Sequence, residues 1–194
     1  MNGDKISIAK TAVLAMDYQA MLVGGAVKDS SQTLAKVSDV LSQSRGAGLP
    51  IIYVTVGFRP GYPEVSDNNM IFSAVRDGQR FQIGDEGSQI PPEIQPERDD
   101  VVLVKHRISA FEGTDLAMLL RARGVDTLIM FGITTSGVIL STVRQAADLD
   151  YRMIVLEDLC HDFDEDVHRF LFENILPRQA TTMQSDEYVQ MLLQ

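Results

Sequence analysis

Short apolar runs alternate with helix-like segments along this chain, and this alternation constrains its fold more than any other feature. Runs at 11–17, 51–56, 101–105, 126–132, 152–158 and 180–183 have the length and apolar content of buried parallel strands. Apolar residues at helical spacing predict helices at 31–48, 114–124, 136–150 and 164–176. Strands that alternate with helices form a parallel sheet covered on both faces. We therefore predict an α/β protein, a three-layer α/β/α, Rossmann-like domain with a mostly parallel sheet of about six strands.

Length and charge narrow the classes of partner. The 194 residues suit one domain, 1–194, that is large enough to bury its own core. A net charge of −10 without a Lys/Arg-rich run argues against nucleic acid and anionic membranes as partners. Cys160 is the single cysteine, and we see neither an export signal nor an apolar run long enough to span a membrane. We expect a cytoplasmic protein.

Ligands of open parallel sheets bind beyond the carboxyl ends of the strands. Asp17 ends the first predicted strand and Lys105 the third, while the turns 133–138 and 158–162 follow two later strands. We expect these four elements to converge on one site. The segment from Gly57 to about Asp100 breaks the alternation, and such a long excursion indicates a functional loop whose role the sequence does not give.

Several of these residues belong to longer stretches that resemble one family. The stretches are AMDYQ (15–19), VKHRISAFEGTDL (104–116), GVDTLIMFGITTSGVILST (124–142) and VLEDLCHD (155–162). Together they resemble the isochorismatase-like cysteine hydrolases, which include nicotinamidases, N-carbamoylsarcosine amidases and isochorismatases. The resemblance covers nearly the whole chain, from about Thr11 to Met183.

This resemblance implies a catalytic aspartate at Asp17, a lysine at Lys105 and a cysteine nucleophile where this chain has Val138. The last position follows from anchoring on Gly132, Thr135, Thr142 and Ala146; a shift by one residue would bring Gly137 there and lose two anchors. The family's cis peptide would fall at Ile133–Thr134. We assign six residues to substrate binding: Gln19, Arg59, Arg107, Thr134, Thr135 and Gly137.

Valine has no heteroatom, so thioester catalysis at position 138 is chemically excluded. The resemblance offers another route, because some isochorismatases lack the cysteine and hydrolyse a vinyl ether by proton donation from the aspartate. Against this route, Lys105 is expected to hold Asp17 ionised, and Val138 fills space that glycine would leave. The two charges also fit an ion pair with no catalytic role.

The other candidate groups favour structural roles. Ser136 is expected to cap the helix at 136–150, although a hydroxyl nucleophile would need a nearby base. Cys160 beside His161 is a possible displaced nucleophile, but a lone cysteine is more often a buried apolar residue. Phe58 and Tyr18 favour packing over ligand contact. His106 and His168 are too scattered for a metal cluster, so we predict neither a metal nor a cofactor.

These observations leave three functions open. The leading one is a hydrolase of a small, anionic or amide-bearing metabolite in which Asp17 and Lys105 carry the chemistry. The second is a family member that lost catalysis and binds or regulates through a small molecule. The third is a protein-interaction subunit whose segment 57–100 packs into another chain. The resemblance also implies a homodimer or homotetramer.

Overall fold

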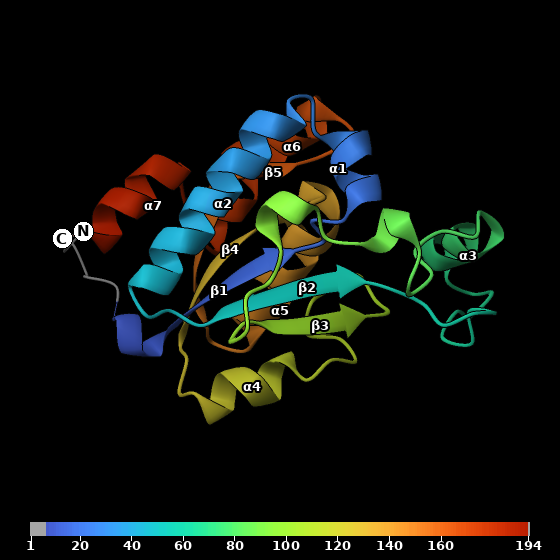
Figure 1. The fold of residues 1–194 in the computed structure, drawn as a ribbon, viewed down its shortest axis with the longest axis horizontal. Helices are drawn as coiled ribbons and strands as arrows, with labels where there is room; N and C mark the ends of the chain where they lie inside the picture. The colour runs from blue at the N-terminus through green and yellow to red at the C-terminus, as the bar shows by residue number, and fades with distance from the viewer. Residues whose placement is uncertain (1–6, 194) are drawn as a thin grey trace.

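A computed structural model describes residues 7–193, and it contains a parallel sheet of six strands in the order β3-β2-β1-β4-β5-β6. The strands β1, β2 and β3 point their carboxyl ends to the same side of the molecule (Figure 1). The bounds of the strands are Thr11–Met16 (β1), Ile51–Val56 (β2), Val101–Lys105 (β3), Thr127–Ile133 (β4), Arg152–His161 (β5) and Thr181–Met183 (β6). The predicted α/β class and the sheet of about six strands are confirmed.

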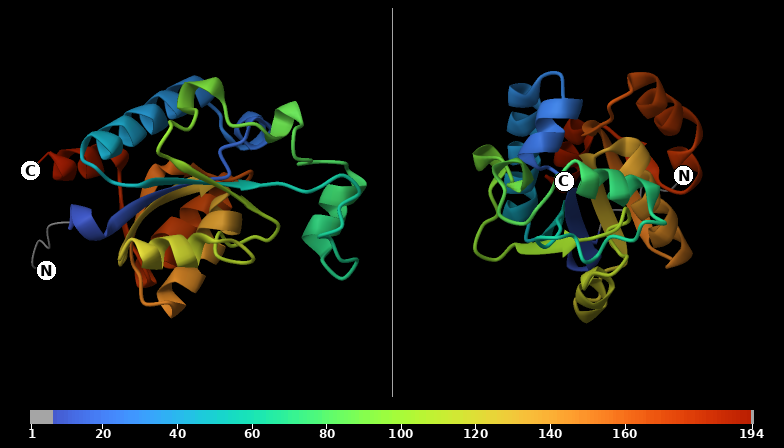
Figure 2. Two further views of the ribbon diagram at one scale, coloured as in Figure 1. Left: turned by 60° about the horizontal axis from the view of Figure 1, so that its bottom comes forward. Right: turned by 90° about the vertical axis from the view of Figure 1, so that its right-hand side faces the viewer.

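Helices cover both faces of the sheet. In the left view of Figure 2, α2 lies on one side of the strands and α4 and α5 lie on the other. The C-terminal helix α7 packs on α2, where the Ser44 and Tyr188 hydroxyls are 2.8 Å apart. The bounds of the α-helices are Ala20–Ala26 (α1), Ser30–Gly46 (α2), Met70–Asp77 (α3), Leu116–Ala122 (α4), Leu140–Asp148 (α5), Glu165–Asn174 (α6) and Ser185–Leu192 (α7).

The central strands are fully buried because the sheet is covered on both faces. Every residue of β1, β2 and β4 is buried. At Gly132 the strands β1 and β4 approach so closely that an added Cβ would lie 2.4 Å from the Met16 carbonyl oxygen. By contrast, β3 is an edge strand, and its Val102 and Val104 are exposed. This difference explains why continuous apolar runs predict the central strands so well.

Three helices lie where the sequence predicted none. They are α1, α3 and α7, each of which has seven or eight residues. The predicted helix 136–150 also differs, since a π-helical turn, Thr135–Ile139, precedes α5. Strand β5 continues three residues past the predicted end at Asp158. Short helices contain too few turns for a clear apolar period, so local pattern alone misses them.

Residues 57–84 form an arm that projects beyond the carboxyl end of β2 and carries α3 (Figures 1 and 2). The arm has an apolar cluster of its own, separate from the main core. Its members are Val56, Phe58, Tyr62, Phe72, Val75 and Phe81. The rest of the excursion, up to Asp100, contains the short 3-10 helices Glu86–Ser88 (η2) and Pro92–Ile94 (η3).

None of the described helices has both the length and the apolar content needed to cross a membrane.

Candidate functional site

Asp17 and Lys105 meet at the carboxyl edge of the sheet, as their places at the ends of β1 and β3 predict. Lys105 Nζ lies 2.9 Å from Asp17 Oδ2, and the two residues are 4% and 3% exposed. Asp17 adopts a φ of 55°, a left-handed conformation that is uncommon outside glycine and concentrates at functional sites. The sequence therefore identified a real and almost fully buried ion pair.

The electrostatics of this pair differ from the sequence-based expectation. Burial raises the pKa of the Asp17 carboxyl above its ordinary value, and the charge and hydrogen bond of Lys105 only partly offset this effect. Asp17 Oδ1 is buried and has no hydrogen-bond partner among the described residues. Lys105 Nζ also donates to the Arg107 carbonyl oxygen at 3.0 Å. Desolvation and Lys105 therefore act in opposite directions on Asp17, and desolvation is the larger influence.

The turn after β4 begins with the Ile133–Thr134 cis peptide that the resemblance implied. Thr134, and not Ser136, caps the following helix: its Oγ1 accepts a hydrogen bond from the Gly137 N–H at 3.1 Å. A Cβ at position 137 would lie 2.6 Å from that oxygen, so glycine permits the cap. The predicted cap at Ser136 is therefore wrong, because the cap lies two residues earlier. The Ser136 N–H instead donates to Asp162 Oδ2 at 2.7 Å.

Val138 lies in this turn and is 2% exposed, as part of the main core. Thr135, two positions after the cis bond, is 0% exposed, and its hydroxyl is 2.8 Å from His168 Nδ1 on α6. A hydroxyl beside an imidazole is the pairing that a nucleophile requires. The Thr135 hydroxyl is fully buried, and its contact with His168 joins α6 to the turn.

The side chain of Gln19, a residue predicted to bind substrate, forms hydrogen bonds with the backbone. Its Nε2 donates to the carbonyl oxygens of Val56 and Ser88 at 2.9 and 2.8 Å, and its Oε1 accepts from the Val56 N–H at 2.9 Å. The residue is 1% exposed. In this structure Gln19 fastens the end of β2 and the η2 segment to the start of α1.

The two arginines assigned to substrate binding converge on Glu64, a residue that the sequence did not single out. Arg59 Nη1 donates to Glu64 Oε1 at 2.6 Å, although the Arg59 side chain is 66% exposed. Arg107 Nη1 donates to the carbonyl oxygens of Glu64 and His106 at 3.1 and 2.6 Å. A carboxylate in a loop carries no periodic signal, so only its contacts reveal Glu64.

Cys160 is buried within β5, and its Cα partner across the ladder is Gly132. Burial strongly raises the pKa of its thiol, which keeps the sulfur neutral and weakly nucleophilic at neutral pH. In the neighbouring His161, the Nε2 atom lies 3.4 Å from the Thr33 Oγ1 atom on α2. The structural role favoured for Cys160 therefore agrees with the structure. Tyr18 and Phe58 are buried too, and the Tyr18 hydroxyl donates to the Leu159 carbonyl oxygen at 2.6 Å.

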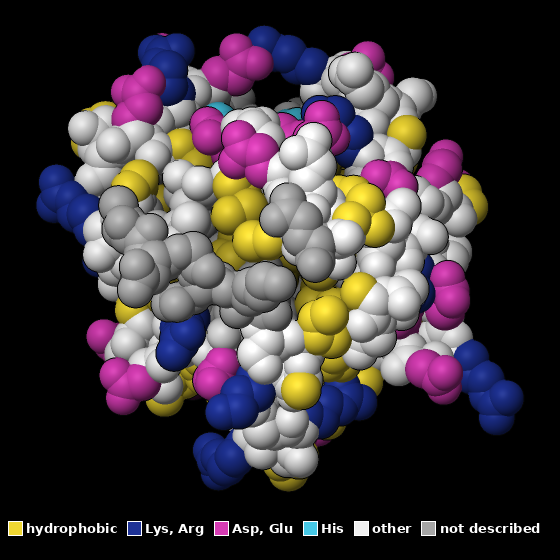
Figure 3. Space-filling view, turned by 90° about the vertical axis from the view of Figure 1, so that its left-hand side faces the viewer, with side chains coloured by type: hydrophobic (Ala, Val, Ile, Leu, Met, Phe, Trp, Pro, Cys, Tyr) yellow, Lys and Arg dark blue, Asp and Glu magenta, His cyan; other side chains and the backbone are white. Residues whose placement is uncertain are grey.

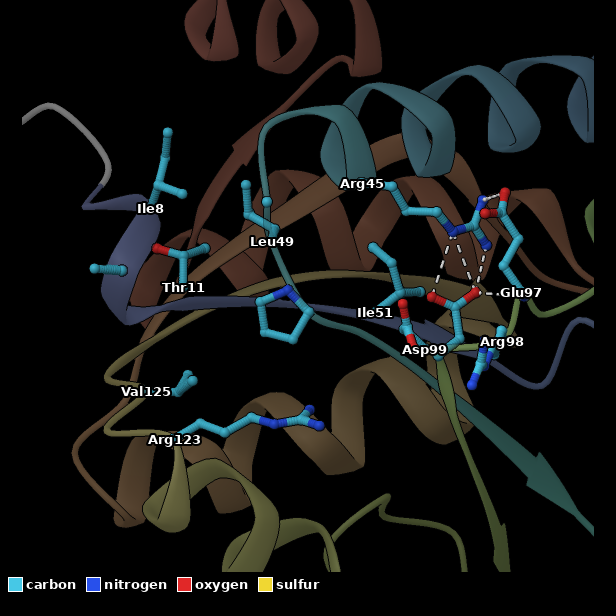
Figure 4. A pocket seen from close by; sticks show the side chains of 14 residues that line it. Ile8, Thr11, Arg45, Leu49, Ile51, Glu97, Arg98, Asp99, Arg123 and Val125 are labelled. Carbon is cyan, nitrogen blue, oxygen red and sulfur yellow. Dashed lines mark hydrogen bonds and ion pairs between the residues drawn. The ribbon is translucent and has the colours of Figure 1, made fainter.

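A cavity of about 640 Å³ lies at the opposite edge, beside the amino ends of the strands (Figure 4). There Arg45 forms two ion pairs: its Nη2 lies 2.6 Å from Asp100 Oδ2, and its Nη1 lies 3.1 Å from Glu97 Oε1. The space-filling view of this end shows Lys and Arg interspersed with Asp and Glu around apolar surface (Figure 3). Parallel sheets bind ligands at the other edge, so we do not assign the site here. Among the described residues, no group of three or more His, Cys, Asp or Glu side chains is arranged to hold a metal ion.

Comparison with known proteins places this geometry in a family. The isochorismatase domain model matches residues 11–187. YwoC, an isochorismatase family protein of Bacillus subtilis (strain 168), is 27% identical over 190 residues, which cover 98% of each chain. The ureidoacrylate amidohydrolase RutB of Agrobacterium fabrum is 29% identical over 179 residues, covering 81% of this chain and 78% of RutB.

Among solved structures, the N-carbamoylsarcosine amidase of Thermoplasma acidophilum is 31% identical with a TM-score of 0.76, and the match covers 91% of this chain and 97% of the amidase. The domain match spans all six strands of the sheet and both residues of the buried ion pair. The chain therefore belongs to the isochorismatase family of hydrolases.

Proposed function

We propose that this protein hydrolyses a small, anionic or amide-bearing metabolite without a cysteine nucleophile, with Asp17 as its acid/base group. The observation that carries the proposal is the state of Asp17. Its carboxyl is buried and has a raised pKa, it is paired with Lys105, and one of its oxygens has no partner among the described residues. A raised pKa moves a carboxyl toward the range in which it can act as a general acid.

Vinyl-ether hydrolysis is the reaction that this group supports best. Protonated Asp17 gives its proton to the terminal vinyl carbon, and a C–H bond forms as an oxocarbenium ion develops. Water adds to the cationic carbon and returns a proton to the Asp17 carboxylate. The resulting hemiketal breaks its C–O bond to release a ketone and an alcohol. In this scheme Lys105 orients the Asp17 carboxyl through its contact with Oδ2. It also stabilises the negative charge that develops on the carboxyl when the proton leaves.

Val138 is proposed to stand at the family's nucleophile position, which agrees with a route that needs no thiol. Two relatives carry names that specify amide-bearing substrates, ureidoacrylate amidohydrolase and N-carbamoylsarcosine amidase, and they keep that chemistry among the candidates. Arg107 is the arginine proposed to receive a carboxylate, since it lines an open cavity beside the arm. The homodimer or homotetramer stays a prediction.

Turnover of a panel of vinyl ethers, amides and ureido acids tests the proposal. Asp17→Asn should lower kcat at least about 100-fold, the size of a typical general acid/base contribution. Cys160→Ser should leave turnover unchanged, because that thiol is buried and neutral. Activity that survives Asp17→Asn, or disappears with Cys160→Ser, would contradict the assignment.

One observation favours the alternative of a family member that binds a small molecule without catalysis. The N–H groups of Ser136 and Gly137, at the start of the helical turn, already donate to Asp162 and Thr134. Donors that are already bonded stabilise a developing oxyanion less well than free ones. Saturable binding of a panel member by the wild-type protein, with no turnover of any, would support this alternative.

A further inference from the structure

The cavity at the amino edge of the sheet takes no part in the proposed catalysis, yet it has the composition of a ligand site. Its volume is about 640 Å³, and it lies between the start of β2, the end of α2, the end of α4 and the turn at 97–100. Leu49, Ile51 and Val125 line it and are buried, so its floor is apolar. An apolar floor with a few charged groups at the rim is typical of sites for small molecules.

A hydrogen-bonded turn forms one side of this rim. The Asp100 N–H donates to the Glu97 carbonyl oxygen at 3.1 Å, and the Glu97 N–H donates to Asp100 Oδ2 at 2.8 Å. Arg45 binds both carboxylates of the turn, at 2.6 Å for Asp100 and 3.1 Å for Glu97. These bonds hold the two central residues of the turn, Arg98 and Asp99, at the edge of the cavity.

Three charged side chains of the cavity form no ion pair among the described residues: Arg98, Asp99 and Arg123. Figure 4 shows the Arg123 side chain extending along the cavity from the end of α4 toward the turn that carries Arg98 and Asp99. Glu97 and Asp100 already bind Arg45. The free groups are therefore two guanidinium groups and one carboxylate, which leave one positive charge without a partner.

We infer that this cavity is a second ligand site, which takes a small monoanion with an apolar body, such as an aliphatic carboxylate. Arg98 and Arg123 bind the anionic group, because the planar N–H donors of arginine match the oxygens of a carboxylate. The apolar body packs on Leu49 and Ile51 and leaves water. The carboxylate of Asp99 repels a second negative charge, which favours a monoanion over a dianion.

This site is separate from the proposed catalytic one. Asp17 and Lys105 lie at the carboxyl ends of β1 and β3, whereas the cavity lies beside the amino ends of the strands. Ile51 lines the cavity as the first residue of β2, so the length of that strand separates the two edges. The inference therefore does not depend on the proposed hydrolysis.

Two probes of the same shape isolate the charge: 4-methylpentanoate and its neutral amide, 4-methylpentanamide. Each is titrated into the full-length protein while the methyl NMR signals of Leu49, Ile51 and Val125 are followed. We expect these signals to shift saturably, with the carboxylate bound about tenfold more tightly than the amide, as charge-assisted hydrogen bonds predict. Added salt should weaken binding of the carboxylate and leave that of the amide unchanged.

The double variant Arg98→Gln/Arg123→Gln should reduce the affinity for the carboxylate about tenfold, to that for the amide. Both side chains are exposed, so the fold should be kept. If the double variant does not fold, each single variant should still cause about a threefold loss. The control Arg144→Gln/Arg178→Gln removes two exposed positive charges outside the cavity and should keep the tenfold preference.

The inference fails if the wild type gives no saturable shift of these methyl signals, or binds the acid and the amide equally. It also fails if the preference persists in Arg98→Gln/Arg123→Gln. Arg107→Gln tests the opposite edge, and loss of the preference in that variant alone would place the anion beside the arm. The readout is binding and not turnover, so a failure of the proposed hydrolysis would leave this site standing.

Discussion

At position 138 a buried valine occupies the helical turn that follows β4. The chemistry of such a turn depends on the whole set of side chains around it and not on a single residue. Asp17, Lys105 and the cis peptide are all present, while the thiol that would use them is proposed to be missing. Restoring the thiol therefore tests whether the surrounding groups still form the family's site.

Val138→Cys should create an amidase activity that a thiol-alkylating reagent abolishes. The two side chains are similar in size, so we expect the free energy of unfolding to change by less than about 1.5 kcal/mol. The wild type should be unaffected by the reagent, since the raised pKa of its Cys160 keeps that thiol neutral, whereas a thiol at a helix start is stabilised as the reactive thiolate. A folded Val138→Cys protein with no activity on any amide in the panel would show that Asp17 and the turn do not constitute the expected site.

Gln19→Met should destabilise the fold although the two side chains have nearly the same shape. The substitution leaves the buried Val56 N–H without its acceptor, which costs about 1–3 kcal/mol. Urea unfolding measures the change. Gln32→Met, at an exposed position on α2, is the control and should stay within about 0.5 kcal/mol of the wild type. Equal stability of the Gln19 and Gln32 variants would contradict a structural role for Gln19.

Among the elements, the arm stands apart from the sheet because its apolar side chains pack mainly on one another. Phe72 of α3 and Phe58 have ring centroids 5.4 Å apart, and Phe58 and Tyr62 have theirs 5.6 Å apart. These residues form a cluster separate from the main core. Segments with their own small cores open more readily than central strands, so we expect the arm to unfold locally before the sheet does.

Phe72→Ala should weaken the arm by about 3–5 kcal/mol, because it removes a buried aromatic ring. Hydrogen exchange should accelerate across residues 57–84 and remain slow in β1 and β4. Ile71→Ala is the matched control, since its neighbouring side chain is 55% exposed and its loss should change exchange little. Faster exchange in β1 and β4 by the same factor as in the arm would show that the two clusters unfold as one.

For the molecule as a whole, two half-buried histidines contribute to the response of stability to pH. Burial lowers the pKa of His161 and also that of His168, while Asp158 opposes the shift at His161 and Glu157, Asp162 and Glu165 oppose it at His168. In the unfolded chain these histidines have their ordinary pKa of 6.5, whereas in the folded protein their pKa is lower. The unfolded chain therefore binds more protons as the pH falls below 6.5. Their contribution to stability is therefore present above pH 6.5 and is lost as the pH falls.

The free energy of unfolding should fall between about pH 7 and pH 5, measured by urea unfolding at each pH. The double variant His161→Gln/His168→Gln should show a smaller fall over the same range. Asp17 has the opposite sign, because its raised pKa means that the folded protein binds this proton more tightly than the unfolded chain does. If the double variant shows the same pH dependence of the free energy of unfolding as the wild type, the histidines do not cause the fall.

Sequence alone determined the parallel sheet, its order of appearance along the chain and the two charges at strand ends, because apolar periodicity and strand termini are local properties. It also placed the turn with the cis peptide through its resemblance to a family. Tertiary structure decided what those groups do. The raised pKa of Asp17, the backbone bonds of Gln19 and the half-paired carboxylate of Glu64 arise from burial among segments that are distant in the chain. Desolvation depends on everything packed around a group, and no local pattern records it.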